Sequence, residues 1–333
     1  MSLRMKTDET AFRTVVDVAR WADPMRRGQR FVLLGSCFAQ NMGEMFQSYG
    51  LDAVCNPLGA AYNPESICIQ IEQALNNEEL RIKNEASLFQ YDGKWRCWWA
   101  NTLLSDTDEE RFRETIRRTF SELGEAIREA DWLFLTLGTN VCYKLKVEKL
   151  KSSKVEKEDS SPFHLFNSSI SNLDGMTVAN CHKVPADKFE EVTLDVEACT
   201  RALSATMELL SKECPRLQVV FTVSPYRYKK YGLHGSQLAK AALLLAVDNV
   251  CRLYPKKARY FPAYELLLDD LRDYRFYAED MIHPAPIAVG YIWRKMVGSC
   301  MDEDMQRYLK DYEPTRKAKE HRSHSHLREG GEK

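Results

Sequence analysis

The feature that most constrains the fold is a series of nearly continuous apolar runs, each followed by a stretch with helical spacing. Such runs occupy residues 31–34 (FVLL), 131–140 (DWLFLTLGTN) and 217–225 (LQVVFTVSP). A strand that is buried on both faces of a parallel sheet has this composition, whereas a strand with one solvated face alternates apolar and polar residues. The runs therefore predict the central strands of a parallel sheet.

Segments with helical spacing lie between these strands and predict crossover helices. The expected helices cover residues 40–50, 64–75, 107–130, roughly 189–213, 236–254 and 286–300, and shorter strands are expected at 52–56 and near 258–262. Residues 88–99 alternate around Asp92-Gly93, which predicts a hairpin. Because strand and helix alternate from residue 31 to residue 300, we expect an α/β protein built as an open three-layer α/β/α sandwich with a mostly parallel sheet.

The pattern also predicts the domain organisation. Residues 1–29 precede the first strand as an N-terminal extension, and residues 30–300 form a single α/β domain. Residues 144–169 are rich in Lys, Glu and Ser and predict an inserted polar loop within that domain. Residues 313–333 are polar throughout, so we expect a disordered tail.

Composition and charge exclude several classes of partner. The 333 residues carry a net charge of -1, which argues against a nucleic-acid-binding protein that works through general charge. The longest apolar run within a helix, AALLLAV at 241–247, is too short to cross a membrane, and the N-terminus lacks the apolar core of a secretory signal. Ten cysteines without a CxxC pair suit a reduced, cytoplasmic protein. We expect no metal and no cofactor, and the oligomeric state stays open.

Polar residues at the ends of the predicted strands indicate where a site would form. Ser36, Asn140 and Ser224 each follow the C-terminal end of a strand. Ligands of open parallel sheets bind at this edge. Ser36 can be a helix N-cap, or it can be a nucleophile that the N–H groups at the helix N-terminus assist. Cys37 is an alternative nucleophile, because a helix N-terminus also favours a thiolate.

A second group of residues can supply a base and hydrogen-bond donors. Asp280 and His283 are three residues apart, so the carboxylate can accept a hydrogen bond from one imidazole nitrogen and leave the other free as a base. Asn140, in Gly-Thr-Asn, and Gly59, in Asn-Pro-Leu-Gly-Ala, can donate hydrogen bonds to an oxyanion. Each pattern is also ordinary turn chemistry when it is taken alone.

Along the chain the four patterns come in the order Ser36, Gly59, Asn140 and Asp280–His283. In this order they resemble the SGNH (GDSL-like) hydrolase superfamily. Residues 35–39, GSCFA, resemble more closely the motif that names the GSCFA-domain proteins, a bacterial branch of that superfamily. The resemblance covers residues 30 to 295, and it extends to NPLGAAYNP (56–64), NCHKVP (180–185), TVSPYR (222–227), GLHGSQLAK (232–240) and EDMIHPAPIAVGYIW (279–293).

The resemblance implies a flavodoxin-like sheet of five parallel strands and a catalytic triad. Ser36 would be the nucleophile, His283 the base and Asp280 the residue that orients it. The N–H groups of Ser36 and Gly59 and the side chain of Asn140 would form the oxyanion hole. The chain departs from the superfamily at Gly35, where Asp is usual, and at Val141, which follows Asn140 where Asp is usual.

The function expected from these residues is hydrolysis of an acyl ester through an acyl-enzyme. The substrate would be a small-molecule or glycan ester, and the resemblance suggests an O-acetyl group on a carbohydrate. Acyl transfer at the same site, and a non-catalytic protein that binds a carbohydrate or another ligand, are the alternatives. Asn56, His182 and His234 would line the cleft. In the polar tail, His321, His324 and His326 lie close together in sequence but lack the Cys or carboxylate partners of a metal site.

Overall fold

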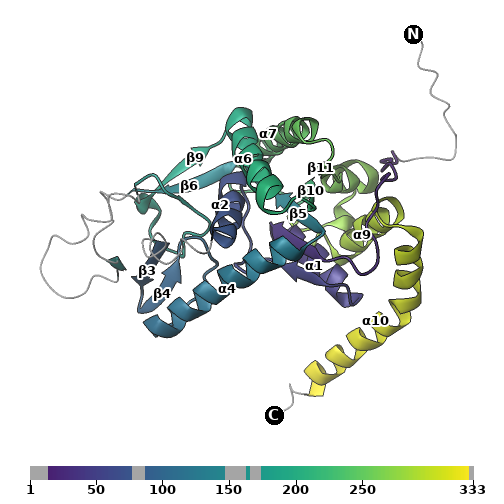
Figure 1. Ribbon diagram of the computed structural model, residues 1–333, viewed down its shortest axis with the longest axis horizontal. Helices are drawn as coiled ribbons and strands as arrows, with labels where there is room; N and C mark the ends of the chain where they lie inside the picture. The colour runs from purple at the N-terminus through teal and green to yellow at the C-terminus, as the bar shows by residue number, and fades with distance from the viewer. Residues whose placement is uncertain (1–13, 77–86, 147–162, 166–173, 330–333) are drawn as a thin grey trace, which may run out of the picture.

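The computed structural model describes residues 14–76, 87–146, 163–165 and 174–329. Its centre is a sheet of five strands, all parallel, in the order β11-β10-β5-β1-β2 (Figure 1). The strands are β1 Phe31–Gly35, β2 Ala53–Cys55, β5 Trp132–Leu137, β10 Gln218–Val223 and β11 Ala258–Tyr260. This is the flavodoxin-like order, and it confirms the predicted fold class.

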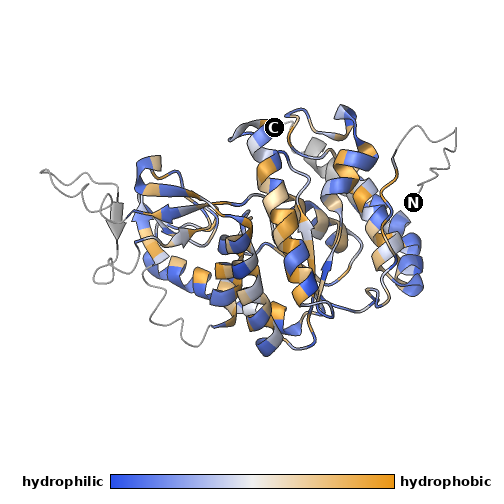
Figure 2. Cartoon of the chain, turned by 90° about the horizontal axis from the view of Figure 1, so that it is seen from above, coloured by the Kyte–Doolittle hydropathy of each residue, from blue (hydrophilic) through white to orange (hydrophobic). Residues whose placement is uncertain are grey.

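Helices cover both faces of the sheet, which explains why its strands are apolar throughout. Residues of β1 alternate between two hydrophobic clusters: Phe31 and Leu33 face one, and Val32 and Leu34 face the other. The first cluster includes residues of α1 Cys37–Ser48 and α9 Pro286–Cys300. The second includes residues of α2 Pro64–Leu75, α4 Glu109–Glu129, α6 Val196–Glu213 and α7 Gly232–Leu253. Hydrophobic residues mark the inner faces of these helices (Figure 2).

The strand order places a topological switch point between β1 and β5. From β1 the chain continues to β2 on one side, and it then crosses back to β5, β10 and β11 on the other side. Ligands of such sheets bind in the crevice outside the carboxyl ends of the two strands at the switch point. In this protein those ends are Gly35 and Leu137, where the register pairs Gly35 with Thr136.

Two small antiparallel sheets lie at one end of the molecule (Figure 1). One contains β3 Leu88–Tyr91, β4 Lys94–Cys97 and β7 Phe163–Leu165, and the other contains β6 Val141–Leu145, β8 Thr177–Val178 and β9 Phe189–Thr193. The β3–β4 pair confirms the predicted hairpin. The inserted loop predicted over 144–169 falls mostly outside the described residues, and the described parts are the end of β6, Lys146 and β7.

The prediction of one helix over 189–213 is wrong at its start. Residues 189–193 form β9, which pairs with β6, and α6 begins only at Val196. The boundary is set by Asp195, whose side chain accepts the N–H of Ala198 as an N-cap. Pairing with a distant strand therefore overrides the local helical spacing.

The prediction of a disordered tail is wrong for residues 313–329, which continue helix α10 Glu303–Glu329. Tertiary contacts anchor this helix, because the Tyr49 hydroxyl donates to Glu313 at 2.6 Å and the Tyr308 hydroxyl donates to the Tyr49 carbonyl at 3.0 Å. Arg316 adds an i,i+3 ion pair with Glu313 at 2.8 Å. Residues 330–333 lie outside the described residues.

The described part of the N-terminal extension, residues 14–29, packs against the α/β core. Trp21 stacks on Trp132 with ring centroids 5.5 Å apart, and Met25 is fully buried. Met25 also receives and donates backbone hydrogen bonds at the end of α9, through Asp302 N–H and the Cys300 carbonyl. Among the described helices, none combines the length and the apolar character that crossing a membrane requires.

Candidate active site at the switch point

The turn after β1 is held very close to β5. Gly35 has φ +131°, and a Cβ atom built on it would lie 2.2 Å from the Thr136 carbonyl oxygen. The Gly35 N–H donates to Asn56 Oδ1 at 2.9 Å, which ties this turn to the end of β2. Only glycine adopts this backbone conformation in so little space. The close approach fixes the start of α1 at the edge of the sheet.

Ser36 is the N-cap of α1. Its backbone is extended, its Oγ accepts the N–H of Phe38 at 3.3 Å, and its own N–H donates to the Thr136 carbonyl at 3.0 Å. The residue is fully buried at 0% exposure. Within the described residues no hydrogen bond joins Ser36 Oγ to His283. The structure therefore shows the capping role that the sequence allowed for Ser36, and the nucleophilic role stays a prediction.

Cys37 begins α1 and is partly exposed, in contrast to its neighbour. The charges of the Lys240 ammonium and the Asp280 carboxylate both act on its thiol. The backbone N–H groups of Cys37 and Phe38 also stabilise negative charge on the sulfur. Burial raises the pKa of the Cys37 thiol, and these N–H groups and Lys240 partly oppose that rise. A nearby base is therefore required to form the thiolate at neutral pH.

Asp280 and His283 make the contact that their spacing predicts. His283 Nδ1 and Asp280 Oδ2 are 2.5 Å apart, and Asp280 Oδ1 accepts the N–H groups of Ile282 at 2.8 Å and His283 at 3.0 Å. The side-chain hydrogen bond to His283 and these N–H groups lower the pKa of Asp280 to about 2. An ionised carboxylate holds the proton on Nδ1, so Nε2 is left to act as a base.

Contacts from the segment that follows β10 hold this pair at the sheet edge. The Arg227 N–H donates to the Ile282 carbonyl at 3.1 Å, and Lys229 Nζ donates to the Asp280 carbonyl at 3.0 Å. The Tyr226 ring lies 4.7 Å from the His283 ring, centroid to centroid. Besides burial, negative charge on Cys37, on Tyr228 and on Asp280 raises the pKa of Tyr226.

Lys240 is the site residue that the sequence analysis missed. It is 2% exposed, and its Nζ donates to the Gly138 carbonyl at 2.6 Å, directly after β5. Burial lowers the pKa of Lys240 to about 7, and negative charge on Cys37 opposes that shift. One signal was available: Lys240 interrupts the stripe of buried residues on α7, which continues through Ser236, Leu243 and Val247. A lysine on an apolar stripe is rarely buried without a purpose.

The donors of the predicted oxyanion hole make hydrogen bonds within the protein. The Ser36 N–H donates to the Thr136 carbonyl at 3.0 Å, and the Gly59 N–H donates to the Asn56 carbonyl at 2.7 Å. Both of these backbone N–H groups therefore already donate a hydrogen bond within the protein, and their role in an oxyanion hole stays a prediction. Asn140 is 5% exposed, and its Nδ2 donates to the Leu194 carbonyl at 2.7 Å, which leaves one amide hydrogen.

The three residues expected to line the cleft have different surroundings. His182 lies in the core with Nε2 2.8 Å from the Cys97 carbonyl and Nδ1 3.1 Å from Thr102 Oγ1, and burial lowers its pKa to about 4, so it is a neutral structural residue. That prediction is wrong. His234 is exposed in the first turn of α7. Asn56 is buried and supports Gly35, and its Nδ2 has no partner among the described residues.

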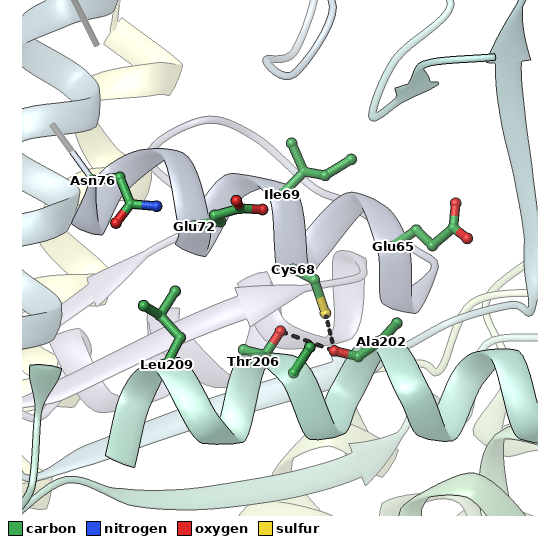
Figure 3. Close-up of a pocket in the computed structure, with 9 residues that line it drawn as sticks. Glu65, Cys68, Ile69, Glu72, Asn76, Ala202, Thr206 and Leu209 are labelled. Carbon is green, nitrogen blue, oxygen red and sulfur yellow. Dashed lines mark hydrogen bonds between the residues drawn. The ribbon is translucent and has the colours of Figure 1, made fainter. Parts of the chain in front are cut away.

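A cavity of about 470 Å³ lies between α2 and α6, apart from these residues (Figure 3). Cys68 on α2 points toward α6, where its thiol donates to the Ala202 carbonyl at 3.3 Å. Glu65 and Glu72 are at its rim. None of the residues around Cys37 lines this cavity. In the described ranges, no group of three or more His, Cys, Asp or Glu side chains is arranged to hold a metal ion.

The burial of Lys240 predicts a pH-dependent gain in stability for Lys240→Met. The pKa is about 7 in the folded protein against 10.5 for a free lysine, so the unfolded chain binds more protons between these values and wild-type stability rises with pH there. Met removes the buried charge. Urea unfolding should show the variant more stable near neutral pH, with the difference shrinking by about 3 kcal/mol from about pH 7 to about pH 9. A constant difference over this range would contradict the burial of a titrating lysine.

Comparison with known proteins identifies the family and finds two solved structures of low similarity. The model of the GSCFA family matches residues 30–296. An acetyl xylan esterase from the rumen bacterium Butyrivibrio proteoclasticus is 13% identical with a TM-score of 0.38, and the match covers 81% of this chain and 63% of the esterase. This chain thus spans less than two thirds of that esterase. A candidate acylhydrolase from Bacteroides fragilis is 9% identical with a TM-score of 0.37, and the match covers 87% of this chain and 90% of that one. No curated protein sequence matches.

Proposed function

The chain belongs to the GSCFA family, and we propose that it hydrolyses acyl esters at the switch point of its parallel sheet. The observation that carries the proposal is the Asp280–His283 pair, which leaves Nε2 without a hydrogen-bond partner among the described residues and whose carboxylate charge acts on Cys37 in the first turn of α1. A histidine oriented by a carboxylate, next to a helix N-terminus that can present a nucleophile, is the arrangement that acyl transfer requires.

The base and the nucleophile have separate tasks in this reaction. His283 accepts the proton of a nucleophile in the first turn of α1 and returns it to the leaving alcohol. It then activates the water that releases the acyl group. Asp280 keeps the imidazole in the tautomer that leaves Nε2 unprotonated and stabilises the imidazolium that forms. These residues carry out all proton transfers of the two steps.

We infer a carbohydrate or another small molecule as the acyl-bearing part of the substrate. Aromatic side chains extend from His283 along the segment after β10: Tyr226 and Tyr228 have ring centroids 6.1 Å apart, and Tyr228 and Tyr231 have centroids 5.4 Å apart. All three are partly exposed. Rings with an apolar face and a polar hydroxyl suit a ligand that is also amphipathic, such as a sugar.

The proposal is tested by the turnover of two esters with the purified, folded protein. We expect hydrolysis of p-nitrophenyl acetate, and a higher kcat/KM for an O-acetylated sugar, because only the sugar can contact the tyrosine row. Free acetate and alcohol in equal amounts indicate hydrolysis. Transfer of the acetyl group to an added alcohol in place of water would instead indicate an acyltransferase. Binding of the acetylated sugar without any turnover would overturn the proposal in favour of a non-catalytic protein.

A further inference from the structure

We propose that Cys37, and not Ser36, is the nucleophile, and that the buried ammonium of Lys240 stabilises its thiolate. The inference rests on the proposed function, because it names the atom that attacks the acyl carbon. It makes the acyl-enzyme a thioester, so the protein would be a cysteine-dependent acyl hydrolase on a parallel α/β sheet.

The two neighbouring side chains have opposite surroundings. Ser36 has extended N-cap geometry, is 0% exposed and uses Oγ to accept the Phe38 N–H. Cys37 is helical, partly exposed and influenced by charges from two other elements, Lys240 of α7 and Asp280 of the loop before α9. A nucleophile must reach both a substrate and a base, and of these two residues Cys37 is the one that is partly exposed and that the charge of Asp280 influences.

Lys240 provides the second, independent observation. The side chain is 2% exposed, and its ammonium makes one hydrogen bond among the described residues, to the Gly138 carbonyl at the end of β5. Strand β5 is the neighbour of β1, so this carbonyl and the start of α1 lie at the same edge. No carboxylate within the described part of the chain forms an ion pair with Lys240. A buried cation without a partner anion stabilises an anion that forms beside it.

The turn also holds donors that have no other acceptor. Asn56 is 8% exposed, its Oδ1 is occupied by the Gly35 N–H, and its Nδ2 is buried without a partner in the described ranges. The N–H groups of Cys37 and Phe38 both lower the pKa of the thiol, but the Phe38 N–H also donates to Ser36 Oγ. Asn56 Nδ2, the Cys37 N–H and Lys240 are therefore available to stabilise negative charge at the nucleophile.

The reaction balances with water as the only co-reactant. In the first step the Cys37 Sγ bonds to the acyl carbon, the ester C–O bond breaks, and the thiol proton passes through His283 Nε2 to the leaving oxygen. In the second step a water oxygen bonds to the acyl carbon, the C–S bond breaks, and a proton from that water passes through His283 to the thiolate. Lys240 transfers no proton in either step, and its protonated form acts as a positioning residue for charge.

Four titratable groups interact electrostatically with the thiol. Lys240 lies on α7, Asp280 on the loop before α9, Tyr62 on the segment before α2 and Tyr226 on the segment after β10. Lys240 is the one cation among them, so its removal should shift the titration of Cys37 upward.

The test combines the alkylation of Cys37 with the capture of the acyl-enzyme. The rate of modification by iodoacetamide is measured against pH, and the modified cysteine is located by peptide mass spectrometry. In Lys240→Met the pH midpoint of Cys37 alkylation should rise by about one unit or more, and the rate near neutral pH should fall about tenfold. Cys251 is also partly exposed and lies on α7, the helix of Lys240. Cys251→Ala is therefore the matched control and should leave Cys37 alkylation unchanged.

The acyl-enzyme distinguishes the two side chains directly. After a brief reaction with p-nitrophenyl acetate, the acetyl group should be found on Cys37 and should be released by neutral hydroxylamine, as a thioester is. Cys37→Ala should lose the adduct and turnover, and the conservative Cys37→Ser should lose at least about a hundredfold in kcat, because a hydroxyl is far less acidic than a thiol. Ser36→Ala should weaken the cap but keep the adduct.

The outcomes separate this inference from the proposed function. If esters are hydrolysed, and Ser36→Ala abolishes turnover while Cys37→Ala retains it, the inference is overturned and the function stands. If Lys240→Met leaves the midpoint of Cys37 alkylation unchanged, the role of Lys240 is overturned. If Cys37 shows the Lys240-dependent midpoint but no ester yields an adduct or a product, acyl hydrolysis is overturned and the activated thiol stands.

Discussion

His283→Ala is expected to lower kcat for ester hydrolysis by about 10²- to 10⁴-fold, because it removes the group that moves every proton in both steps. Asp280→Asn should cause a similar loss, since an amide can donate to Nδ1 and favour the tautomer that protonates Nε2. The pKa of Asp280 is about 2, so its carboxylate is ionised at any ordinary assay pH and the effect of Asp280→Asn should not depend on pH there.

Steady-state kinetics with p-nitrophenyl acetate measure this loss, and added imidazole should restore part of the activity of His283→Ala. Rescue of this kind distinguishes a proton-transfer role from a structural one, because free imidazole can replace a base but not a packed side chain. His321→Ala, on the exposed surface of α10, is the matched histidine control and should keep wild-type turnover. Turnover within about twofold of wild type in folded His283→Ala would exclude this histidine as the base.

Gly35→Ala is expected to destabilise the protein by about 4 kcal/mol or more and to lower the yield of folded protein. The backbone has φ +131°, where an L-residue is strained, and the new Cβ would lie 2.2 Å from the Thr136 carbonyl oxygen. Relief requires β1 and β5 to separate at the centre of the sheet, where the register pairs them over the whole length of β1.

Urea unfolding of three glycine variants can separate strain from contact. Gly93 also has a positive φ, +67°, but a Cβ there meets nothing within 4 Å, so Gly93→Ala should cost only about 1 kcal/mol. Gly298 has open space and lies within α9, so Gly298→Ala should be neutral or stabilise by up to about 1 kcal/mol. A Gly35→Ala variant as stable as Gly93→Ala would show that the turn can move away from β5.

Local patterns predicted the parts of the molecule that depend on local contacts. The apolar runs at 31–34, 131–140 and 217–225 contain β1, β5 and β10, because a strand between two helical layers must be apolar on both faces. The Asp280–His283 contact was also predictable, since three residues of backbone bring the two side chains within reach.

Predictions failed where distant segments compete for the same backbone or side chain. Residues 189–193 have helical spacing, yet pairing with β6 makes them a strand. Residues 313–329 are polar, yet Tyr49 anchors α10 through Glu313. His182 was expected at a cleft, yet the Cys97 carbonyl and Thr102 enclose both ring nitrogens in the core.

The sequence by itself determined the order of strands and helices, and therefore a site at the carboxyl edge of the sheet with a histidine–carboxylate pair beside the start of α1. Only the tertiary structure decided which of two adjacent residues is buried and which is partly exposed at the start of α1. Ser36 and Cys37 are chemically similar along the chain, but the close approach of Gly35 to Thr136 buries the first as a cap and leaves the second partly exposed. Lys240, more than two hundred residues away in sequence, then influences the thiol because α7 packs over the end of β5. The charge that a side chain experiences depends on neighbours across the fold, which no local pattern specifies.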